Sequence, residues 1–247
     1  MGLLAASAED ILAAQNATAA QFESGAGIIN SLGTSVSPFY PVHNTELMPL
    51  DPLQAIKSGN AAGVDVLIGS NSDETTLWSY GDVDEAKLQR IATEFDVADG
   101  LSTYRGCRPN ANAEQLLVAL TSDHLFRIPC IRMAEAQLKH TPNVWMYLFD
   151  WKSRAFDGRL GATHALEIPF AFNNLDRAGV DVFIGPGPLP QDLADTMHQA
   201  WSDFIKHGSP DWPSYTTAQR STMVFADTSS TVEDPMGEER LVWDGVR

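Results

Sequence analysis

Two polar loops of this sequence hold side chains that could carry out acid–base chemistry. The first loop, residues 69–74, follows a short run of β-branched residues and ends in the adjacent carboxylates Asp73 and Glu74. The second loop, residues 157–170, carries His164 within a Gly-Ala-Thr-His sequence. A His on a loop that a sheet holds in place can act as a general base near neutral pH. Two carboxylates that follow a buried strand need polar partners. The two loops are therefore candidates for one catalytic site.

Each of these residues also has a simpler interpretation when it is considered alone. Asp73 and Glu74 suit the first turn of a helix, where a carboxylate interacts favourably with the helix dipole. His164 could be a structural residue that hydrogen-bonds its own loop. His164 and Glu167 could instead bind a metal at an i,i+3 spacing, but no H-x-x-x-H or C-x-x-C motif accompanies them. The other five His form no ligand pattern either, so we predict no metal and no cofactor.

Both loops follow predicted strands. Residues 64–69 form a short run that predicts a buried strand, and residues 144–149 are apolar on both faces, which predicts a central strand covered on both sides. Strands alternate with helical segments, which indicates an α/β fold. In open α/β sheets, functional groups collect beyond the carboxyl ends of the strands. The other expected elements are a helix beginning after Ser7, irregular structure over residues 23–49, helices over residues 84–95, 112–140 (split near Pro129) and 190–207, and a last strand over residues 222–226.

The composition is typical of a soluble globular chain, which we expect to form a single domain over residues 1–247. Hydrophobic residues make up 44% of the 247 residues, and the mean hydropathy is −0.15. The net charge of −16 opposes binding to nucleic acid or to an anionic membrane surface. No secretory signal or membrane-spanning stretch is visible, which favours a cytoplasmic location. Cys107 and Cys130 are expected to be free thiols rather than one disulfide.

The order of the two loops, an acid and then a His, matches the second half of the order Ser…Asp/Glu…His used by α/β-hydrolases. The nucleophile of such enzymes lies earlier, on a G-x-S-x-G turn between a strand and a helix. Residues 33–37 come nearest but lack the final Gly, and residues 23–27 have Phe22 where the first Gly belongs. No H-G-G-G oxyanion segment is present. The sequence therefore contains no recognisable nucleophile turn.

Five stretches together make the chain resemble the C-terminal half of type-B carboxylesterases, the cholinesterase-like and para-nitrobenzyl-esterase-like branch of the α/β-hydrolases. Residues 67–74 (LIGSNSDE) are similar to the family pattern l-x-G-x-n-x-D-E-G, and residues 161–170 (GATHALEIPF) to its catalytic-His segment G-A-x-H-x-x-E-l-p-f. The other three stretches are residues 39–42 (f-x-P-V), 123–129 (D-x-x-F-x-x-P) and 201–215 (W-x-x-F-a-x-x-G-x-P…W-P-x-Y). The resemblance spans nearly the whole chain.

The resemblance implies that Glu74 is the acid and His164 the general base of a Ser-His-Glu triad that hydrolyses a small-molecule carboxylic ester. Asp73 is then a neighbour of the acid rather than the acid itself, and Glu167 occupies a recurring family position with no catalytic role assigned to it. Thr75 departs from the pattern, because the family usually has Gly there and Gly tolerates backbone conformations that Thr does not.

The family's N-terminal half, which carries the nucleophile and the oxyanion-hole glycines, has no counterpart in this sequence. The resemblance therefore implies the C-terminal portion of an α/β-hydrolase sheet with its covering helices. Such a chain is expected to be inactive by itself, and either to pair with the N-terminal half of the same hydrolase or to self-associate. Two alternatives stay open, a non-catalytic cholinesterase-like binding module and a truncated product without function.

Overall fold

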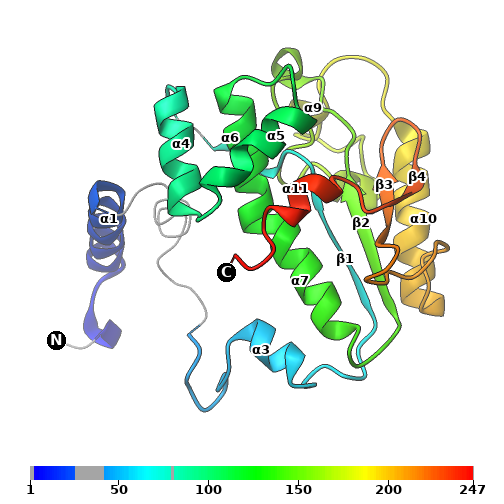
Figure 1. Cartoon of the computed structure of the whole chain (residues 1–247), viewed down its shortest axis with the longest axis horizontal. Helices are drawn as coiled ribbons and strands as arrows, with labels where there is room; N and C mark the ends of the chain where they lie inside the picture. Colours follow the sequence, from blue (N-terminus) through cyan, green and yellow to red (C-terminus); the bar gives the residue numbers. More distant parts are fainter. Residues whose placement is uncertain (1–2, 26–41, 79–80, 247) are drawn as a thin grey trace.

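In the part of the chain that the structure describes, a four-stranded mixed sheet forms the centre. A computed structural model describes residues 3–25, 42–78 and 81–246, and its strands lie in the order β1-β2-β3-β4 (Figure 1). The strands β1 (Val66–Asn71), β2 (Val144–Phe149) and β3 (Ser221–Phe225) are parallel, and β4 (Ser230–Glu233) pairs antiparallel with β3. The parallel strands are separated by helices, so the predicted α/β class is confirmed.

Helices and short turns connect the strands. The helices predicted from the sequence are present with closely similar bounds, whereas those over residues 52–57, 101–107, 168–171, 181–184 and 237–241 were not predicted. The side chain of Asp84 accepts the Lys87 amide at the start of α4, and Gly208 ends α10 in the left-handed conformation. Ser7 Oγ accepts the Asp10 amide (3.1 Å) as predicted. Within the described ranges the α-helices are α1 (Ala8–Gly25), α3 (Pro52–Lys57), α4 (Glu85–Glu94), α5 (Leu101–Cys107), α6 (Ala113–Ser122), α7 (Ile128–Gln137), α8 (Ile168–Ala171), α9 (Asp181–Ile184), α10 (Gln191–His207) and α11 (Gly237–Leu241).

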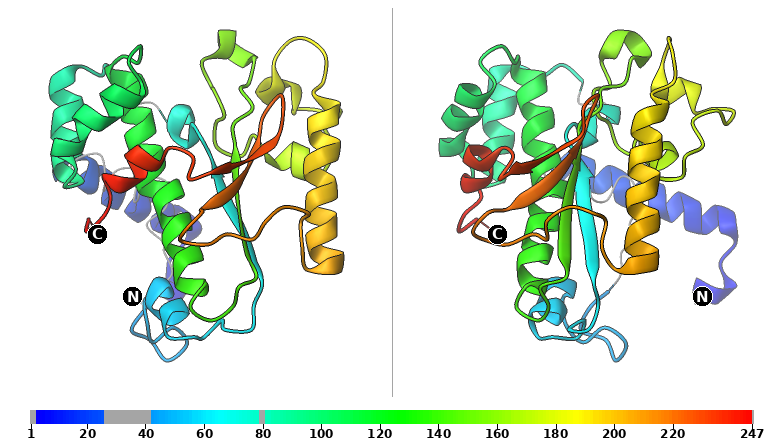
Figure 2. Two further views of the ribbon diagram at one scale, coloured as in Figure 1. Left: turned by 45° about the vertical axis from the view of Figure 1, so that its right-hand side comes forward. Right: turned by 90° about the vertical axis from the view of Figure 1, so that its right-hand side faces the viewer.

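The sheet lies between two helical layers, with α7 on one face and α10 on the other (Figure 2). Alternate side chains of β2 serve the two faces. Val144 and Met146 pack in one buried cluster with Ala134 of α7, whereas Trp145 and Phe149 pack in another with residues of α8 and α10. The prediction that residues 144–149 form an interior strand covered on both sides is therefore confirmed.

The first strand differs from the prediction in both of its ends and in its burial. It begins at Val66 rather than Val64, because the Val64 amide closes a turn by donating to the Ala61 carbonyl (2.9 Å). It ends at Asn71 rather than Gly69, because Ser70 and Asn71 still pair with β2. Its first four residues are half-buried, and only Ser70 and Asn71 are buried. The prediction of a wholly buried strand was wrong because β1 pairs with β2 alone among the described strands and lies at the edge of the sheet.

Two further features differ from the sequence prediction. The helical stretch 112–140 divides near Pro129, as predicted, but a π-helical turn that was not predicted, Asp123–Arg127, joins its two parts. Pro129 lies in the first turn of α7, where its missing amide costs no hydrogen bond. The last strand is β4, not β3. All four β4 residues are exposed, so the strand buries no apolar side chain and has no hydrophobic pattern from which to predict it.

The remaining sequence hypotheses concern the cysteines, membrane-spanning helices and the nucleophile turn. Cys107 and Cys130 are free thiols, as predicted. No helix within the described ranges is long and apolar enough to span a bilayer. Residues 33–37, the nearest match to a nucleophile turn, lie outside the described residues, as do part of the 23–27 and 39–42 stretches and most of the expected irregular region 23–49.

Candidate active site

Glu74 and His164 meet at the carboxyl end of the parallel strands. Glu74 begins the 3-10 turn Glu74–Leu77 just after β1, and His164 lies on the loop that precedes α8. Glu74 Oε2 is 2.6 Å from His164 Nδ1, and the His164 amide donates to the Glu74 carbonyl (3.1 Å). The two loops therefore lie on the same side of the sheet, and the predicted proximity of acid and His is confirmed.

The Glu74 carboxyl group is held in a buried, hydrogen-bonded position. The residue is 5% exposed, and Oε1 accepts the Asn71 amide (2.8 Å). Burial raises the pKa of Glu74, while the hydrogen bonds from Asn71 and His164 act in the opposite direction. An ionised carboxylate only accepts hydrogen bonds, so a Glu74 carboxylate directs the imidazole proton to Nδ1 and leaves Nε2 free to accept a proton.

The His164 ring is supported on its sides and open at its far nitrogen. Its centroid lies 5.6 Å from that of Trp78 and 5.2 Å from that of Phe126. The side chain is 47% exposed, and Nε2 makes no hydrogen bond with any residue that the structure describes. A ring oriented at Nδ1 and accessible at Nε2 is suited to general-base catalysis.

Asp73 joins the acid loop to the His loop. Its amide donates to the Ala162 carbonyl (3.0 Å), and its Oδ2 accepts both the Ala162 amide (2.9 Å) and the Lys152 ammonium (2.6 Å). Asp73 therefore faces the backbone before His164, while Glu74 faces the His164 ring. This geometry agrees with the expectation that Asp73 is a neighbour of the acid.

Gly161 allows this close approach, and its substitution should disturb the His loop. Its φ is +56°, and an added Cβ would lie 2.3 Å from Asp73 Oδ2. We expect Gly161→Ala to lower the free energy of unfolding by about 1–3 kcal/mol through backbone strain, plus the displacement of Asp73, as measured by urea denaturation. The matched control is Gly81→Ala, since Gly81 has φ +61° and no neighbour within 4 Å. Equal stability losses in the two variants would contradict a role for the Asp73 contact.

Thr75 fits its position without the backbone freedom of Gly. It is fully buried, and it is not among the residues with positive φ. Its Oγ1 lies 2.7 Å from Thr121 Oγ1, and its amide donates to Ser122 Oγ (3.3 Å). The departure from the family pattern therefore adds polar contacts with α6 and does not distort the acid loop.

Three residues of the site were not identified as functional from the sequence. Asn71 contacts both loops, and Trp78 and Phe126 pack against the His164 ring. Asn71 and Phe126 belong to the motifs quoted above, but a motif does not say which side chain a residue contacts. Trp78 had no signal, because it follows the acid loop in a segment without periodicity.

The metal hypothesis receives no support. Glu167 Oε2 accepts the Asn71 side-chain amide (2.6 Å), and His164 Nδ1 is taken by Glu74. No group of three or more His, Cys, Asp or Glu side chains gathers as a ligand set within residues 3–25, 42–78 and 81–246.

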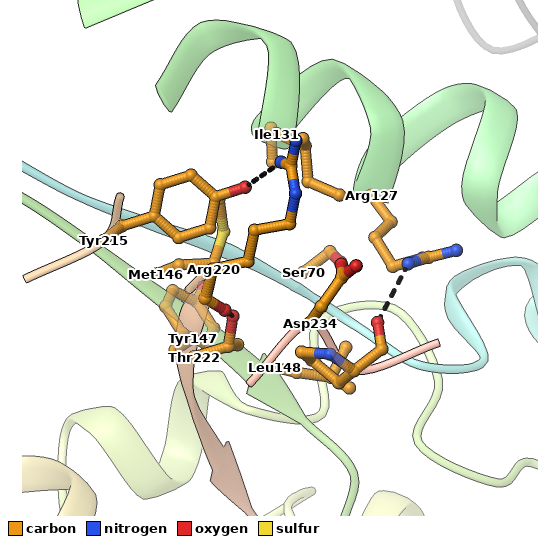
Figure 3. Close-up of a pocket in the computed structure, with 12 residues that line it drawn as sticks. Ser70, Arg127, Ile131, Met146, Tyr147, Leu148, Tyr215, Arg220, Thr222 and Asp234 are labelled. Carbon is orange, nitrogen blue, oxygen red and sulfur yellow. Dashed lines mark hydrogen bonds between the residues drawn. The ribbon is translucent and has the colours of Figure 1, made fainter. Parts of the chain in front are cut away.

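Two cavities lie near the sheet. An open cleft of about 840 Å³ borders the acid loop, and the residues that line it include Asp73, Thr76, Trp78, Gln115 and Arg159. A small cavity of about 20 Å³ lies between α7 and the sheet (Figure 3). Neither Glu74 nor His164 lines either cavity, although the cleft is bordered by their neighbours Asp73 and Trp78.

Comparison with known proteins identifies the family. The sequence matches the carboxylesterase family over residues 3–242. The chain belongs to the carboxylesterase family. It is 32% identical over 211 residues to the para-nitrobenzyl esterase of Bacillus subtilis, covering 82% of this chain and 42% of that protein. It is 27% identical over 208 residues to the phenmedipham hydrolase of Pseudarthrobacter oxydans, covering 78% and 41%.

Solved structures agree with this assignment. A PNB esterase superposes with a TM-score of 0.73 at 29% identity over 96% of this chain and 48% of that one. A carboxylesterase of Geobacillus stearothermophilus superposes with a TM-score of 0.72 at 29% identity over 90% and 50%. This carboxylesterase chain therefore has the fold of α/β-hydrolase esterases, and it spans about half the length of the relatives it matches.

Proposed function

We propose that this chain supplies the acid and the general base for carboxylic-ester hydrolysis by a Ser-His-Glu triad. Glu74 is the acid and His164 the base, and a Ser from a segment outside this chain is the nucleophile. The observation that carries the proposal is the 2.6 Å contact between Glu74 Oε2 and His164 Nδ1 in a member of the carboxylesterase family.

The proposed reaction follows from the orientation of the imidazole. As the Ser hydroxyl attacks the ester carbonyl, His164 Nε2 takes its proton, and the imidazolium then protonates the departing alkoxide. Water attacks the acyl-Ser by the same route, releasing the carboxylic acid and restoring the Ser hydroxyl. Glu74 keeps the other imidazole proton on Nδ1 and stabilises the positive charge that forms on the ring.

The alternative of a non-catalytic binding module accounts less well for the site. The relatives of this chain at lower identity include human neuroligin-2, at 24% identity over 235 residues. A binding module needs neither an oriented imidazole nor a buried carboxyl group beside it. Burying a carboxyl group costs free energy. A binding module gains nothing from that cost, so the Glu74–His164 hydrogen bond favours the enzyme.

The partner that we propose for this chain is the N-terminal half of the same hydrolase, joined along β1. The Val66 and Ser72 amides donate toward the β2 side of the sheet, so the intervening Leu67 and Gly69 amides point to the opposite edge, along which no described strand pairs with β1. Val64 and Leu77, which lie shortly before and after β1 in the sequence, are about half exposed. Unpaired backbone groups and apolar side chains together suit the addition of further strands.

Reconstitution tests the triad. The isolated chain should hydrolyse a p-nitrophenyl ester no faster than free imidazole does, because it has no recognisable nucleophile turn. Co-expression with the N-terminal half of the Bacillus subtilis para-nitrobenzyl esterase should produce turnover that requires both chains. In this reconstituted enzyme, His164→Ala should abolish the gain, whereas His207→Ala, at the exposed end of α10, should leave it intact. Turnover that survives His164→Ala would contradict the proposal.

The open edge of β1 leads to an expectation for the isolated chain. We expect it to self-associate or to have a low melting temperature, because no described strand pairs with the outer edge of β1. The repulsion that a net charge of −16 provides does not satisfy these backbone groups. Light scattering and a thermal melt measure both properties. A monodisperse monomer at high concentration, with a cooperative transition at high temperature, would show that the chain covers this edge itself.

A further inference from the structure

Asn71 makes three contacts that join the acid to both sides of His164. It is the last residue of β1 and is 2% exposed. Its backbone amide donates to Glu74 Oε1 (2.8 Å). Its side-chain Nδ2 donates to the Thr163 carbonyl (2.6 Å) and to Glu167 Oε2 (2.6 Å). Thr163 precedes His164 directly and Glu167 follows it three residues later, so one amide group spans the His loop.

We propose that Asn71 is a positioning residue for the acid–base pair, an inference that rests on the function proposed above. The side chain sets the position of the His164 ring relative to Glu74 by holding the loop from a rigid strand. β1 is fixed by its parallel pairing with β2, in which Asn71 lies opposite Phe149. The hydrogen bonds of Asn71 therefore fix the His loop, which has no regular structure of its own, in place relative to the sheet.

The backbone next to His164 needs such support. Ala165 has a φ of +66°, a left-handed conformation that a residue with a Cβ adopts only when its surroundings impose it. The carbonyl before His164 and the carboxylate after it are both bound to Asn71 Nδ2. These two hydrogen bonds restrain the loop on either side of the strained residue.

The Asn71 side-chain amide also fixes the position of a second carboxylate, that of Glu167. Glu167 lies close enough to Glu74 for its charge to act on the Glu74 carboxyl group. Because Asn71 Nδ2 holds Glu167 Oε2, Glu167 is kept from competing with Glu74 for the His164 ring. Asn71 Oδ1 has no hydrogen-bonding partner among the described residues, so the NH₂ group alone makes the side-chain hydrogen bonds. An oxygen in its place would face two acceptor oxygens and repel both.

The experiment is ¹H and ¹⁵N NMR of His164 in the full 247-residue chain. The wild type should show a downfield Nδ1–H resonance and ring ¹⁵N shifts of the Nδ1–H tautomer, both assigned by their loss in His164→Ala. Asn71→Asp, which is isosteric but places an oxygen against two acceptors, should remove the downfield resonance and mix the two tautomers. Asn143→Asp is the matched control, because Asn143 Nδ2 also binds a carboxylate, Asp65 (2.9 Å), at the opposite end of the sheet.

Two further variants separate positioning from folding. Asn71→Asp combined with Glu167→Gln restores one hydrogen bond in the reverse direction and should recover part of the resonance, which a loss of packing alone would not. Asn71→Ser is smaller and uncharged, and it should weaken the resonance. It keeps the test possible if the Asp variant does not fold. Ring shifts unchanged from wild type in a folded Asn71 variant would overturn the inference, as would loss of folding in every Asn71 variant. Absence of the Nδ1–H resonance in the wild type would instead count against the proposed triad.

Discussion

Glu74→Gln should lower kcat of the reconstituted enzyme by about 10⁴-fold while the site keeps its shape. Gln has one acceptor oxygen, whereas Glu74 accepts hydrogen bonds from both the Asn71 amide and His164 Nδ1. The Asn71 backbone amide is fixed at the end of β1 and needs an acceptor, so the Gln oxygen stays with it. The Gln NH₂ then faces His164. The ring must then accept at Nδ1 and carry its proton on Nε2, where it cannot act as a base toward Ser.

The measurement is kcat for a p-nitrophenyl ester, combined with ring ¹⁵N shifts that report the tautomer. Both should change together, and KM should stay nearly constant because Glu74 is buried behind the imidazole. Glu46→Gln, in an exposed loop, is the control for removing a carboxylate from this chain. A Glu74→Gln enzyme with wild-type kcat would remove Glu74 from the triad.

The same substitution should change how stability depends on pH. Burial raises the pKa of Glu74 in the folded state, so its contribution to stability is fully present at acidic pH and is lost as pH rises through the raised pKa. Gln does not titrate. The free energy of unfolding of Glu74→Gln minus that of the wild type should therefore increase from acidic to neutral pH, as measured by urea denaturation. A difference that falls with pH would contradict the direction of the shift.

The meeting of Glu74 and His164 was predictable because it depends on features that act locally. The apolar runs before each loop are strands, the strands are parallel neighbours, and parallel strands end at the same edge of a sheet. Capping residues such as Asp84 and Gly208 likewise act within one turn of their helix. These features are present in the sequence itself, and the structure confirms them.

The remaining features depend on contacts between distant segments. Phe126 reaches the His164 ring only because the π-helical turn places it there. β4 forms by pairing with β3 and buries no side chain. The Asn71 side chain selects Thr163 and Glu167 from many acceptors in the chain. None of these partners is set by periodicity or spacing, so a single sequence does not identify them.

The buried ion pair of Asp123 and Arg127 is the strongest case of this kind. Its i,i+4 spacing is that of an ordinary surface pair, yet both residues are buried. Arg127 Nε and Nη2 bind the two Asp123 oxygens at 2.6 and 2.8 Å, and Nη1 donates to the Pro235 carbonyl at 3.3 Å (Figure 3). Asp123 also accepts the Tyr104 hydroxyl, which in turn accepts Trp243 Nε1 at 2.8 Å. The pair thus connects α5 and the π-helical turn to the C-terminal segment.

Arg127→Ala should therefore lower the free energy of unfolding by about 3–5 kcal/mol, because it leaves the Asp123 carboxylate buried without its cation. That loss is a large share of the roughly 5–15 kcal/mol that stabilises a typical domain. Arg90→Ala is the matched control, since Arg90 and Glu94 form an i,i+4 pair at 2.9 Å on the exposed face of α4 and should contribute only about 0.3–0.5 kcal/mol. Asp123→Asn combined with Arg127→Met removes both charges and should recover much of the stability. Equal losses in Arg127→Ala and Arg90→Ala, measured by urea denaturation, would show that burial does not determine the strength of this pair.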